Sequence, residues 1–384
     1  MIGGGSKMRI AIIGGGIGGL CTTYALLQKG IDVEVFEAAH SFKPIGAGIG
    51  IGSNAMQDLV DLGIGEEIYA DGTILKTQEF YSGNGKLLNT IDFSALQKLY
   101  NQSNITIQRA DLHRSLFQAI PAHLLHLNKK CIAVNQVDSN CQITFSDGNI
   151  VNFDYVIAAD GIHSPIRQQL VPNSKPRFAG YMCWRGVAEI TNQIEPNTSV
   201  EIWDTIGRFG YAPLKDGKVY WFACVNASEK DQFLHGLEKE QIAHLFKNFP
   251  KQVGEIIRAT EQTTILHHDL YDLAPLKQFH FNRILLLGDA AHATTPNMGQ
   301  GAGQAIEDAL ALSQMFDLHD SFEDAAAAYE QKRMPKTKKV TTLSRQIGWI
   351  AQWQNPVLAK ARDLAFPFVP SSLLLKRLKF LFSK

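Results

Sequence analysis

A glycine cluster near the start of the chain reads Gly-Gly-Gly-Ile-Gly-Gly and satisfies the pattern G-x-G-x-x-G, between a short apolar run (9–13) and a helix-like stretch. Gly14 permits a tight turn, Gly16 lets the backbone approach a phosphate, and Gly19 lets the helix pack on its strand. Glu37 ends the next β-rich run, where a carboxylate accepts hydrogen bonds from ribose hydroxyls and disfavours a 2′-phosphate. This context predicts an adenine dinucleotide, FAD or NAD, and does not choose between the two.

Two further acidic residues, Asp160 and Asp289, follow apolar runs that read as buried parallel strands. The carboxyl ends of such strands are where cofactors bind in open α/β sheets, and a carboxylate there accepts two polyol hydrogen bonds at once. Gly299 and Gly301 then open a helix whose positive N-terminal end suits a group that gains negative charge. The second and third motifs therefore predict cofactor contacts beyond the dinucleotide loop.

The three motifs, in this order and over nearly the whole chain, resemble the group A flavin-dependent aromatic hydroxylases, the family of para-hydroxybenzoate and salicylate hydroxylases. The second motif is Ala-Ala-Asp-Gly-Ile-His-Ser-Pro-Ile-Arg (158–167), and the third is Leu-Gly-Asp-Ala-Ala-His (287–292) with Pro-Asn-Met-Gly-Gln-Gly (296–301) beyond it. The resemblance implies a tight, noncovalent FAD and a transient NAD(P)H, since no second G-x-G-x-x-G is present. It also implies that dioxygen adds at the C4a carbon of the reduced flavin and that the resulting hydroperoxide hydroxylates a ring.

The resemblance assigns cofactor contacts residue by residue. It places Asp289 on the ribityl hydroxyls, Arg109 at the phosphate and ribityl region, Gly48 and Gly50 beside the isoalloxazine ring, and the backbone of Cys131 at adenine. Asp160 and Gly161 would lie near the pyrophosphate and the path of the nicotinamide nucleotide. The predicted cofactor-binding set is Gly14, Gly16, Gly19, Glu37, Ala38, Gly48, Gly50, Arg109, Cys131, Asp160, Gly161, Asp289, Pro296, Gly299, Gly301 and Ala302.

Substrate contacts are predicted on two neighbouring strands in the second half of the chain. Arg208 and Tyr220 resemble an arginine and a tyrosine of the urate and salicylate hydroxylase branch that hold a planar or anionic substrate. A guanidinium offers planar, bidentate recognition and a phenol a directional hydrogen bond. The alternatives are an interdomain salt bridge for Arg208 and core packing for Tyr220. His163 and His292 are expected to orient loops rather than to act as acids or bases.

The pattern of elements predicts an α/β protein: a Rossmann-like FAD-binding domain with an inserted, mainly antiparallel β-sheet substrate domain and a C-terminal helical tail. A βαβ unit opens the chain, 54–71 reads helical, 76–92 reads as a hairpin, and the four runs between 181 and 225 read as one antiparallel sheet. We expect the FAD-binding domain to comprise 8–75, 100–180 and 275–345, the substrate domain 76–99 and 181–274, and the tail 346–384.

The composition points away from polyanionic partners. The 384 residues include 37 basic and 37 acidic ones, so nucleic acid is not an expected partner. The five cysteines form no Cys-x-x-Cys pair, and neither a metal site nor a disulfide framework is predicted. No apolar run reaches the 20 or so residues of a transmembrane segment, and no signal peptide is evident, so we expect a cytoplasmic protein. The sequence leaves a monomer and a homodimer both open.

The predicted activity is hydroxylation of a small aromatic or heteroaromatic molecule with NAD(P)H and dioxygen. Alternatives are a tetracycline-inactivating or other polycyclic-substrate monooxygenase, a flavin reductase or halogenase on the same fold, and a non-catalytic flavoprotein that sequesters a ligand. The Trp-x-Trp-x-Ile-Pro motif of halogenases is absent from the sequence. Prolines at 356, 367 and 370 break the tail into short pieces, which favours a cover over the two domains rather than a membrane helix.

Overall fold

The structure is a computed structural model that describes residues 8–42, 47–190 and 194–382. Its central six-stranded sheet has a parallel core, because β1 pairs in parallel with β2 and β12. An antiparallel edge strand, β18, completes the sheet on one side. The strand order is β18 (His280–Phe281), β19 (Ile284–Leu286), β12 (Tyr155–Ala158), β1 (Arg9–Ile13), β2 (Asp32–Phe36) and β8 (Leu125–His126).

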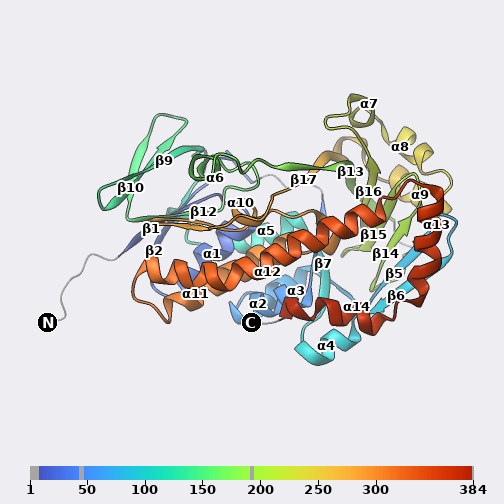
Figure 1. Ribbon diagram of the computed structural model, residues 1–384, viewed down its shortest axis with the longest axis horizontal. Helices are drawn as coiled ribbons and strands as arrows, with labels where there is room; N and C mark the ends of the chain where they lie inside the picture. The colour runs from blue at the N-terminus through green and yellow to red at the C-terminus, as the bar shows by residue number, and fades with distance from the viewer. Residues whose placement is uncertain (1–7, 43–46, 191–193, 383–384) are drawn as a thin grey trace.

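Helices and a small sheet cover the two faces of this parallel sheet (Figure 1). Its strands β1, β12 and β19 are short and, apart from Arg9, apolar, as expected for strands buried on both sides. The small sheet contains β9 (Cys131–Val137), β10 (Asn140–Phe145) and β11 (Ile150–Phe153). The principal helices are α1 (Ile17–Leu27), α2 (Ser53–Asp61), α3 (Gly65–Asp71), α5 (Arg109–Gln118), α6 (Pro165–Leu170), α10 (Asp289–His292), α11 (Gly301–Phe316) and α12 (Phe322–Ala351).

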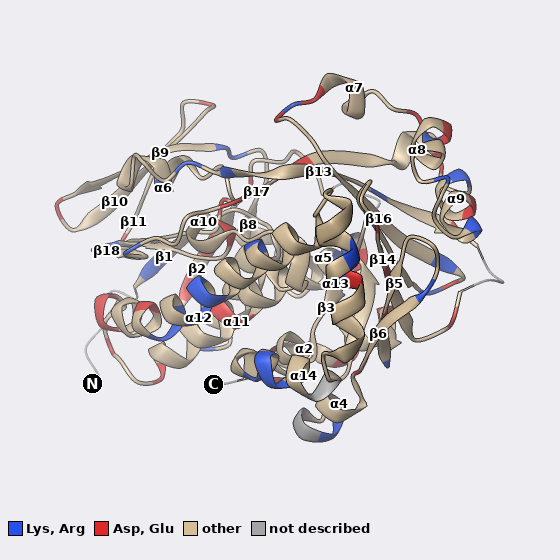
Figure 2. Cartoon of the chain, turned by 45° about the vertical axis from the view of Figure 1, so that its right-hand side comes forward, with Lys and Arg blue, Asp and Glu red and all other residues tan. Residues whose placement is uncertain are grey.

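A seven-stranded sheet forms the second layer, and its outer face packs on short helices (Figure 2). Neighbouring strands are antiparallel except β14 and β5, which pair in parallel, so the sheet is mixed at that position. The outer helices are α7 (Gln232–His235), α8 (Lys239–Leu245) and α9 (Lys251–Arg258). The strand order is β17 (Leu266–Asp272), β13 (Arg177–Glu189), β16 (Lys218–Asn226), β15 (Arg208–Pro213), β14 (Thr198–Trp203), β5 (Thr77–Ser82) and β6 (Leu87–Asp92).

Smaller elements connect these layers. A third small sheet has the order β3 (Gly48–Ile51), β7 (Asn104–Gln108) and β4 (Thr73–Leu75). Short helical turns fill the connections: α4 (Ser94–Tyr100), η1 (Ala122–Leu124), η2 (Gln262–Thr264) and η3 (Pro296–Met298). The single helix expected over 54–71 is instead two helices, because Gly63 adopts a left-handed φ of 86° and ends α2.

The tail forms two short helices and two helical turns: α13 (Pro356–Ala365), η4 (Phe366–Phe368), α14 (Ser371–Leu378) and η5 (Lys379–Phe382). The Asn89 side chain of β6 donates hydrogen bonds to the carbonyl oxygens of Phe366 and Val369, at 2.8 and 3.0 Å. The Lys336 ammonium of α12 donates to the Leu381 carbonyl at 2.7 Å. The tail therefore joins the edge of the seven-stranded sheet to the long helix α12, as expected of a cover.

The prediction of an α/β protein with an inserted, mainly antiparallel sheet and a helical tail is confirmed. No helix in the described part of the chain is long and apolar enough to cross a membrane.

Candidate active site

The glycine loop lies between β1 and α1, directly against the second motif. Gly14 has a φ of 108°, and a Cβ there would overlap the Ala159 carbonyl, so glycine is needed both for the turn and for this contact. At Gly16, by contrast, a Cβ would meet no described atom within 4 Å. The first turn of α1 has neither an acidic residue nor a side-chain cap among the described residues. Its free N–H groups and positive helix end therefore suit an anion such as a pyrophosphate.

The Glu37 carboxylate is fixed beside the loop by backbone groups. One oxygen accepts the Gly15 N–H at 2.6 Å, and the other accepts the Ala39 N–H at 2.7 Å. A carboxylate oxygen has a second lone pair, so both can still accept from ribose hydroxyls. The loop is also contacted by His113, whose Nε2 hydrogen-bonds to the Gly15 carbonyl at 2.7 Å. Burial lowers the pKa of His113, which favours a neutral imidazole at this position.

Asp160 holds two buried carboxylate oxygens that make no hydrogen bond of normal geometry within the described structure. Burial raises the pKa of Asp160 to about 6, against the opposing effects of the Ser164 hydroxyl and the Arg167 guanidinium. Cys131 lies near this carboxylate, and burial raises the pKa of its thiol to about 12, so the thiol stays protonated. A buried carboxylate without partners beside a glycine loop would be satisfied by a cofactor that donates hydrogen bonds from hydroxyl groups.

Arg167 links the second motif to the third. Its buried guanidinium donates to the carbonyl oxygens of Ile162 at 2.6 Å, Ala290 at 3.2 Å and Ser174 at 3.2 Å. The loop that carries Asp160 is thereby tied to the helix that begins with Asp289. The two carboxylates are consequently held in fixed relation to each other.

Asp289 begins α10, just beyond the carboxyl end of β19, and its side chain is exposed. The surrounding protein nevertheless desolvates it and raises its pKa, while His292 and Arg109 act in the opposite direction. Desolvation lowers the pKa of the Arg109 guanidinium, and the charge of Arg185 lowers it further. Asp289 and Tyr220 interact with the same guanidinium and oppose this change. Residues from the first layer and from the seven-stranded sheet thus converge at one place.

A buried ionic network, which the sequence motifs did not indicate, holds α10, α11 and α12 together. Asp308 accepts the Gly288 N–H at 3.0 Å, bonds to His292 Nε2 at 2.6 Å and accepts from Arg333 Nε at 2.6 Å. Burial alone would raise the pKa of Asp308, but His292 and Arg333 together keep it well below its usual range. His292 therefore helps to position Asp308 and the start of α10, which agrees with the expected orienting role. Because the network joins residues of three different helices, the spacing of residues along the chain could not reveal it.

Three of the predicted cofactor residues lie at the N-terminus of α11. Gly299 precedes it in a left-handed conformation, Gln300 occupies the N-cap position without a side-chain capping hydrogen bond, and Gly301 and Ala302 begin its first turn. The Gln300 amide is itself fixed by a hydrogen bond from Asn54 at 3.1 Å. The first turn has no acidic residue, so the positive end of this 16-residue helix is not neutralised locally. Such an end can stabilise negative charge on the edge of a bound ring.

The inner face of the seven-stranded sheet presents Arg208, Tyr220 and Arg185 together. Residues directly opposite in a sheet share a face, and the register pairs Arg208 with Cys224, Ala212 with Tyr220, and Arg185 with Phe222. Alternate residues on these strands, such as Trp221, face the outer helices. The two residues predicted to contact substrate therefore point to the same side, and Arg185 joins them there.

Tyr220 contacts the cofactor-binding layer directly. A Cβ at Gly48 would overlap the Tyr220 Cβ and Cγ atoms, so only glycine allows β3 and β16 to approach this closely. Burial raises the pKa of Tyr220 well above its usual value, although Arg185 opposes the change, and the phenol remains neutral near pH 7. The structure thus gives Gly48 a role in bringing the two layers together at the tyrosine.

Arg208 is only 2% exposed and is held by both layers. Its guanidinium pairs with Glu201 at 3.2 Å, donates to the Asn297 side-chain oxygen of η3, and lies 5.5 Å from the centre of the Tyr181 ring. Its Nε, like the Nε of Arg185, is buried and has no hydrogen-bond partner among the described residues. Arg208 therefore makes an interdomain contact and still offers a donor on the inner face.

Residues 7–344 match the protein family described as FAD binding domain. The chain belongs to this family. It is 32% identical over 93% of its length, and 93% of the relative's, to aurachin C monooxygenase/isomerase of Stigmatella aurantiaca. It is 31% identical over 88% of its length, and 86% of the relative's, to 3-amino-4-hydroxybenzoate 2-monooxygenase of Streptomyces cremeus. The predicted membership of the group A flavin-dependent monooxygenases, and with it the predicted FAD-dependent oxidoreductase class, is confirmed.

Solved structures show the same fold. The structure of Klebsiella pneumoniae HpxO complexed with FAD and uric acid has a TM-score of 0.91 at 24% identity, covering 98% of this chain and 97% of that one. A salicylate hydroxylase substrate complex has a TM-score of 0.80 at 24% identity, covering 98% and 95%. The inserted-sheet architecture is therefore common to these flavoproteins.

The structure brings most of the predicted site residues together. The glycine loop, Asp160, Asp289 and the start of α11 line one region, and Arg109 interacts electrostatically with both Asp289 and Tyr220. Ala38 and Pro296 are exposed beside this region. Sequence reasoning did not find Asn297, Tyr181 or His268, whose contacts connect distant strands and loops. Among the described residues, no cluster of His, Cys, Asp or Glu could hold a metal ion.

Proposed function

We propose that this flavoprotein hydroxylates a small, planar aromatic or heteroaromatic compound bearing ring oxygen or nitrogen substituents, with NAD(P)H and dioxygen as co-substrates. The observation that carries the proposal is the pair of buried guanidinium nitrogens, Arg208 Nε and Arg185 Nε, on the sheet face that also bears Tyr220. Buried donors without partners are rare in proteins, and a ligand acceptor would satisfy them. The curated relatives act on aminohydroxybenzoate, hydroxynicotinate and urate, which fits this class of compound.

The inner face has the right chemistry to orient such a ring. Phe222 lies between the two arginines, 6.0 Å from the Arg208 guanidinium and 6.3 Å from the Tyr220 ring, and offers an apolar surface. Tyr220 would donate a directional hydrogen bond from its neutral phenol, and the arginines would hold an oxygen, nitrogen or carboxylate of the ring. These residues would fix the ring in one orientation and exclude water from it.

The residues of the first layer fit FAD. The glycine loop and α1 would hold its pyrophosphate, Glu37 its ribose, Asp289 and Arg109 its ribityl region, and the start of α11 the pyrimidine edge of its ring. The orphaned oxygens of Asp160 support a cofactor at this place. Bound FAD, once reduced by NAD(P)H, supplies the activation of dioxygen that the side chains cannot perform. A transient NAD(P)H, a cytoplasmic location and a monomeric or homodimeric state remain part of the proposal.

A coupled assay tests the proposed activity. NADH or NADPH oxidation and dioxygen uptake would be followed with a panel of phenols, hydroxylated nitrogen heterocycles and tetracyclines, and the products identified by mass spectrometry. We expect one group of planar substrates to gain one oxygen atom per nicotinamide oxidised. Stimulated oxidation without any oxygenated product would contradict monooxygenation and indicate a reductase, whereas binding without oxidation would indicate a sequestering protein.

Two substitutions test the roles of the inner-face residues. Tyr220→Phe and Arg208→Gln should keep FAD and slow, substrate-free NAD(P)H oxidation, since neither residue is proposed to hold the cofactor. The fraction of nicotinamide oxidation that yields product should fall, more for Arg208→Gln, because a misplaced ring lets reducing equivalents appear as hydrogen peroxide. Full coupling with unchanged substrate affinity in both variants would show that these side chains are structural.

A further inference from the structure

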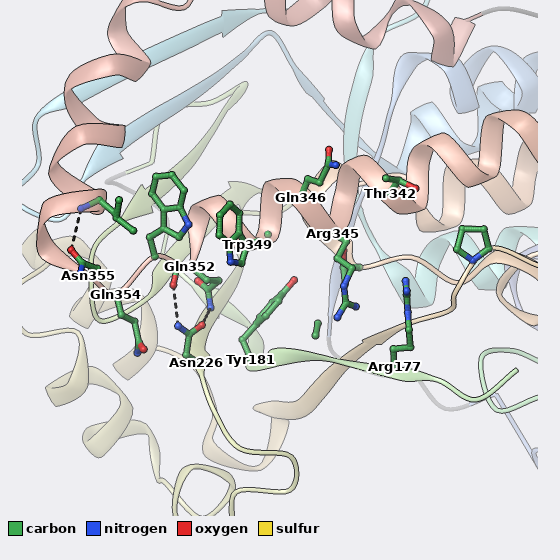
Figure 3. Close-up of a pocket in the computed structure, with 17 residues that line it drawn as sticks. Arg177, Tyr181, Asn226, Thr342, Arg345, Gln346, Trp349, Gln352, Gln354 and Asn355 are labelled. Carbon is green, nitrogen blue, oxygen red and sulfur yellow. Dashed lines mark hydrogen bonds between the residues drawn. The ribbon is translucent and has the colours of Figure 1, made fainter. Parts of the chain in front are cut away.

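A cavity of about 790 Å³ lies between the C-terminal part of α12 and strand β13, outside the residues proposed to bind FAD or the ring to be hydroxylated. Figure 3 shows Arg345 and Trp349 of α12 facing Arg177 and Tyr181 of β13 across it. We call it the α12 cavity. Its volume is within the range of sites for small organic ligands.

Aromatic rings form one part of the α12 cavity. Trp349 and Trp353 have ring centres 5.3 Å apart and meet at 89°, and the Trp349 side chain is 67% exposed. Tyr181 points from β13 toward the helix and adds a third ring to the lining (Figure 3). An exposed indole ring beside a cavity offers a face on which a planar aromatic ligand can stack.

The charge at the other end of the cavity is positive. Arg177 and Arg345 share one carboxylate, Asp272, at 2.9 and 2.8 Å, and Asp272 is completely buried while the arginine side chains are 41% and 39% exposed. One buried carboxylate between two guanidiniums leaves a surplus positive charge facing the cavity. The described residues that line the cavity include no Asp or Glu. An anionic group on a ligand would therefore meet a net attraction, since two guanidiniums outweigh the one carboxylate.

Unpaired polar atoms complete the lining. Gln352 is only 7% exposed, yet its side-chain oxygen has no hydrogen-bond partner within the described structure. The Trp353 indole N–H is likewise buried and unpartnered there. Buried groups of this kind are normally satisfied, so a ligand with polar substituents would improve the local energy.

From these contacts we propose that the α12 cavity is a second ligand site that binds a planar aromatic anion, with its ring against Trp349 and its anionic group on Arg345 and Arg177. The site neighbours the inner face of the sheet, since the Tyr181 hydroxyl that lines it bonds to Asn297, the partner of Arg208. Binding at the cavity does not depend on the proposed hydroxylation and is tested without turnover.

Equilibrium dialysis of the FAD-loaded protein with 2-naphthoate tests the site, with the neutral 2-naphthamide as the charge control. We expect saturable binding of naphthoate at least tenfold tighter than that of naphthamide, weakened by added salt. Naphthoate should also quench tryptophan fluorescence, because Trp349 is in contact with it. Equal affinities for the acid and the amide would overturn the proposal.

Paired variants locate the binding. Gln346 lines the cavity and is exposed, so Gln346→Glu adds one negative charge there with little change of shape. It should weaken naphthoate binding severalfold and leave naphthamide unchanged, whereas Gln331→Glu, exposed elsewhere on α12, should change neither. Trp349→Ala should weaken both probes and Trp349→Phe should largely restore them. Naphthoate binding that persists unchanged in Gln346→Glu and Trp349→Ala would place the ligand elsewhere and refute the inference.

Two sources share the required chemistry: a free aromatic acid and a nicotinamide nucleotide with its phosphates. Competition by NADP⁺ separates them. Displacement of cavity-bound naphthoate by NADP⁺ would support a nicotinamide nucleotide as the occupant. Displacement by aromatic acids alone would support a waiting site for an aromatic acid beside the inner face.

Discussion

Asp289 and Asp160 both follow strands of the parallel sheet, but the structure surrounds them differently. Asp289 is exposed and lies near the Arg109 guanidinium, whereas the Asp160 oxygens are buried without hydrogen-bond partners in the described structure. The first carboxylate is thus poised to accept hydrogen bonds, and the second carries an energetic penalty that a cofactor would relieve. We therefore expect replacement of Asp289 to change FAD affinity and replacement of Asp160 to change stability.

For Asp289, replacement should affect the cofactor more than the fold. Asp289→Ala should weaken FAD binding by roughly 2–4 kcal/mol, about thirtyfold to near a thousandfold, because a charge-assisted pair of hydrogen bonds is lost. FAD titration of the flavin-free protein measures the change, and circular dichroism checks the fold. Asp320→Ala, an exposed control, should bind FAD as the parent does. Unchanged FAD affinity in Asp289→Ala would remove this residue from the site.

For Asp160, the raised pKa makes stability depend on pH. The folded-state pKa of about 6 exceeds the ordinary 3.8, so the penalty of the buried charge is absent below pH 4 and complete above pH 6. Asp160→Asn should therefore stabilise the flavin-free protein at pH 7.5 by at most about 3 kcal/mol, with the gain shrinking toward pH 4.5. Urea denaturation at both pH values measures it. A pH-independent effect, or a loss of stability at pH 7.5, would contradict this account.

At the scale of elements, local patterns predicted most strands correctly because their apolar and β-branched residues alternate or run continuously. The parallel pairing of β14 with β5 was not predictable, since it joins residues 77–82 to 198–203 and no local pattern encodes that distance. The division of 54–71 was missed because Gly63 acts through its left-handed backbone, which a count of apolar residues does not reveal. Arg208 was found through its resemblance, whereas its partner Asn297 stands in the third motif without a predicted role, because the contact between them joins segments 89 residues apart.

Helix α12 illustrates how packing overrides helix propensity. Gly348 lies inside this helix, where alanine would normally stabilise by about 1 kcal/mol. A Cβ at this position would overlap the Asn297 amide nitrogen and lie 3.1 Å from the Tyr181 hydroxyl. The glycine therefore permits α12 to approach η3 and β13.

We expect Gly348→Ala to destabilise the protein by about 1–3 kcal/mol despite the gain in propensity, because the Asn297 amide is held by several partners and cannot move aside. The midpoint of urea unfolding at constant m-value measures this. Thr342→Ala, at an exposed position on the same helix, should leave stability within about 0.5 kcal/mol. Equal behaviour of the two variants would mean that the close approach is not a constraint.

At the scale of the whole molecule, the single side-chain amide of Asn297 joins the seven-stranded sheet, the segment before α11 and helix α12. Its oxygen accepts from Arg208 of β15 and from the Tyr181 hydroxyl of β13, and its nitrogen donates to the Ser344 carbonyl of α12 at 2.8 Å and to Thr295 Oγ1 at 2.9 Å. The substrate sheet, the loop before α11 and the long helix that leads to the tail therefore meet at one side chain. Their relative placement fixes the distance between the inner face and the cofactor residues.

Asn297→Ala should reduce stability by roughly 2–4 kcal/mol, because several buried partners lose their hydrogen bonds. It should also lower coupling, because the Arg208 guanidinium would then be held by its bond from Nη1 to Glu201 without the second bond to residue 297. FAD content should stay close to that of the parent, since Asp289 and the glycine loop are untouched. Asn297→Asp keeps an acceptor for Arg208 and removes the two donors, so it should restore coupling more than stability. Urea unfolding, FAD content and product formed per NAD(P)H oxidised separate these effects. If Asn297→Ala lost stability but stayed fully coupled, the placement of Arg208 would not depend on this amide, and the layers would be held in register by the contact of Tyr220 with Gly48 instead.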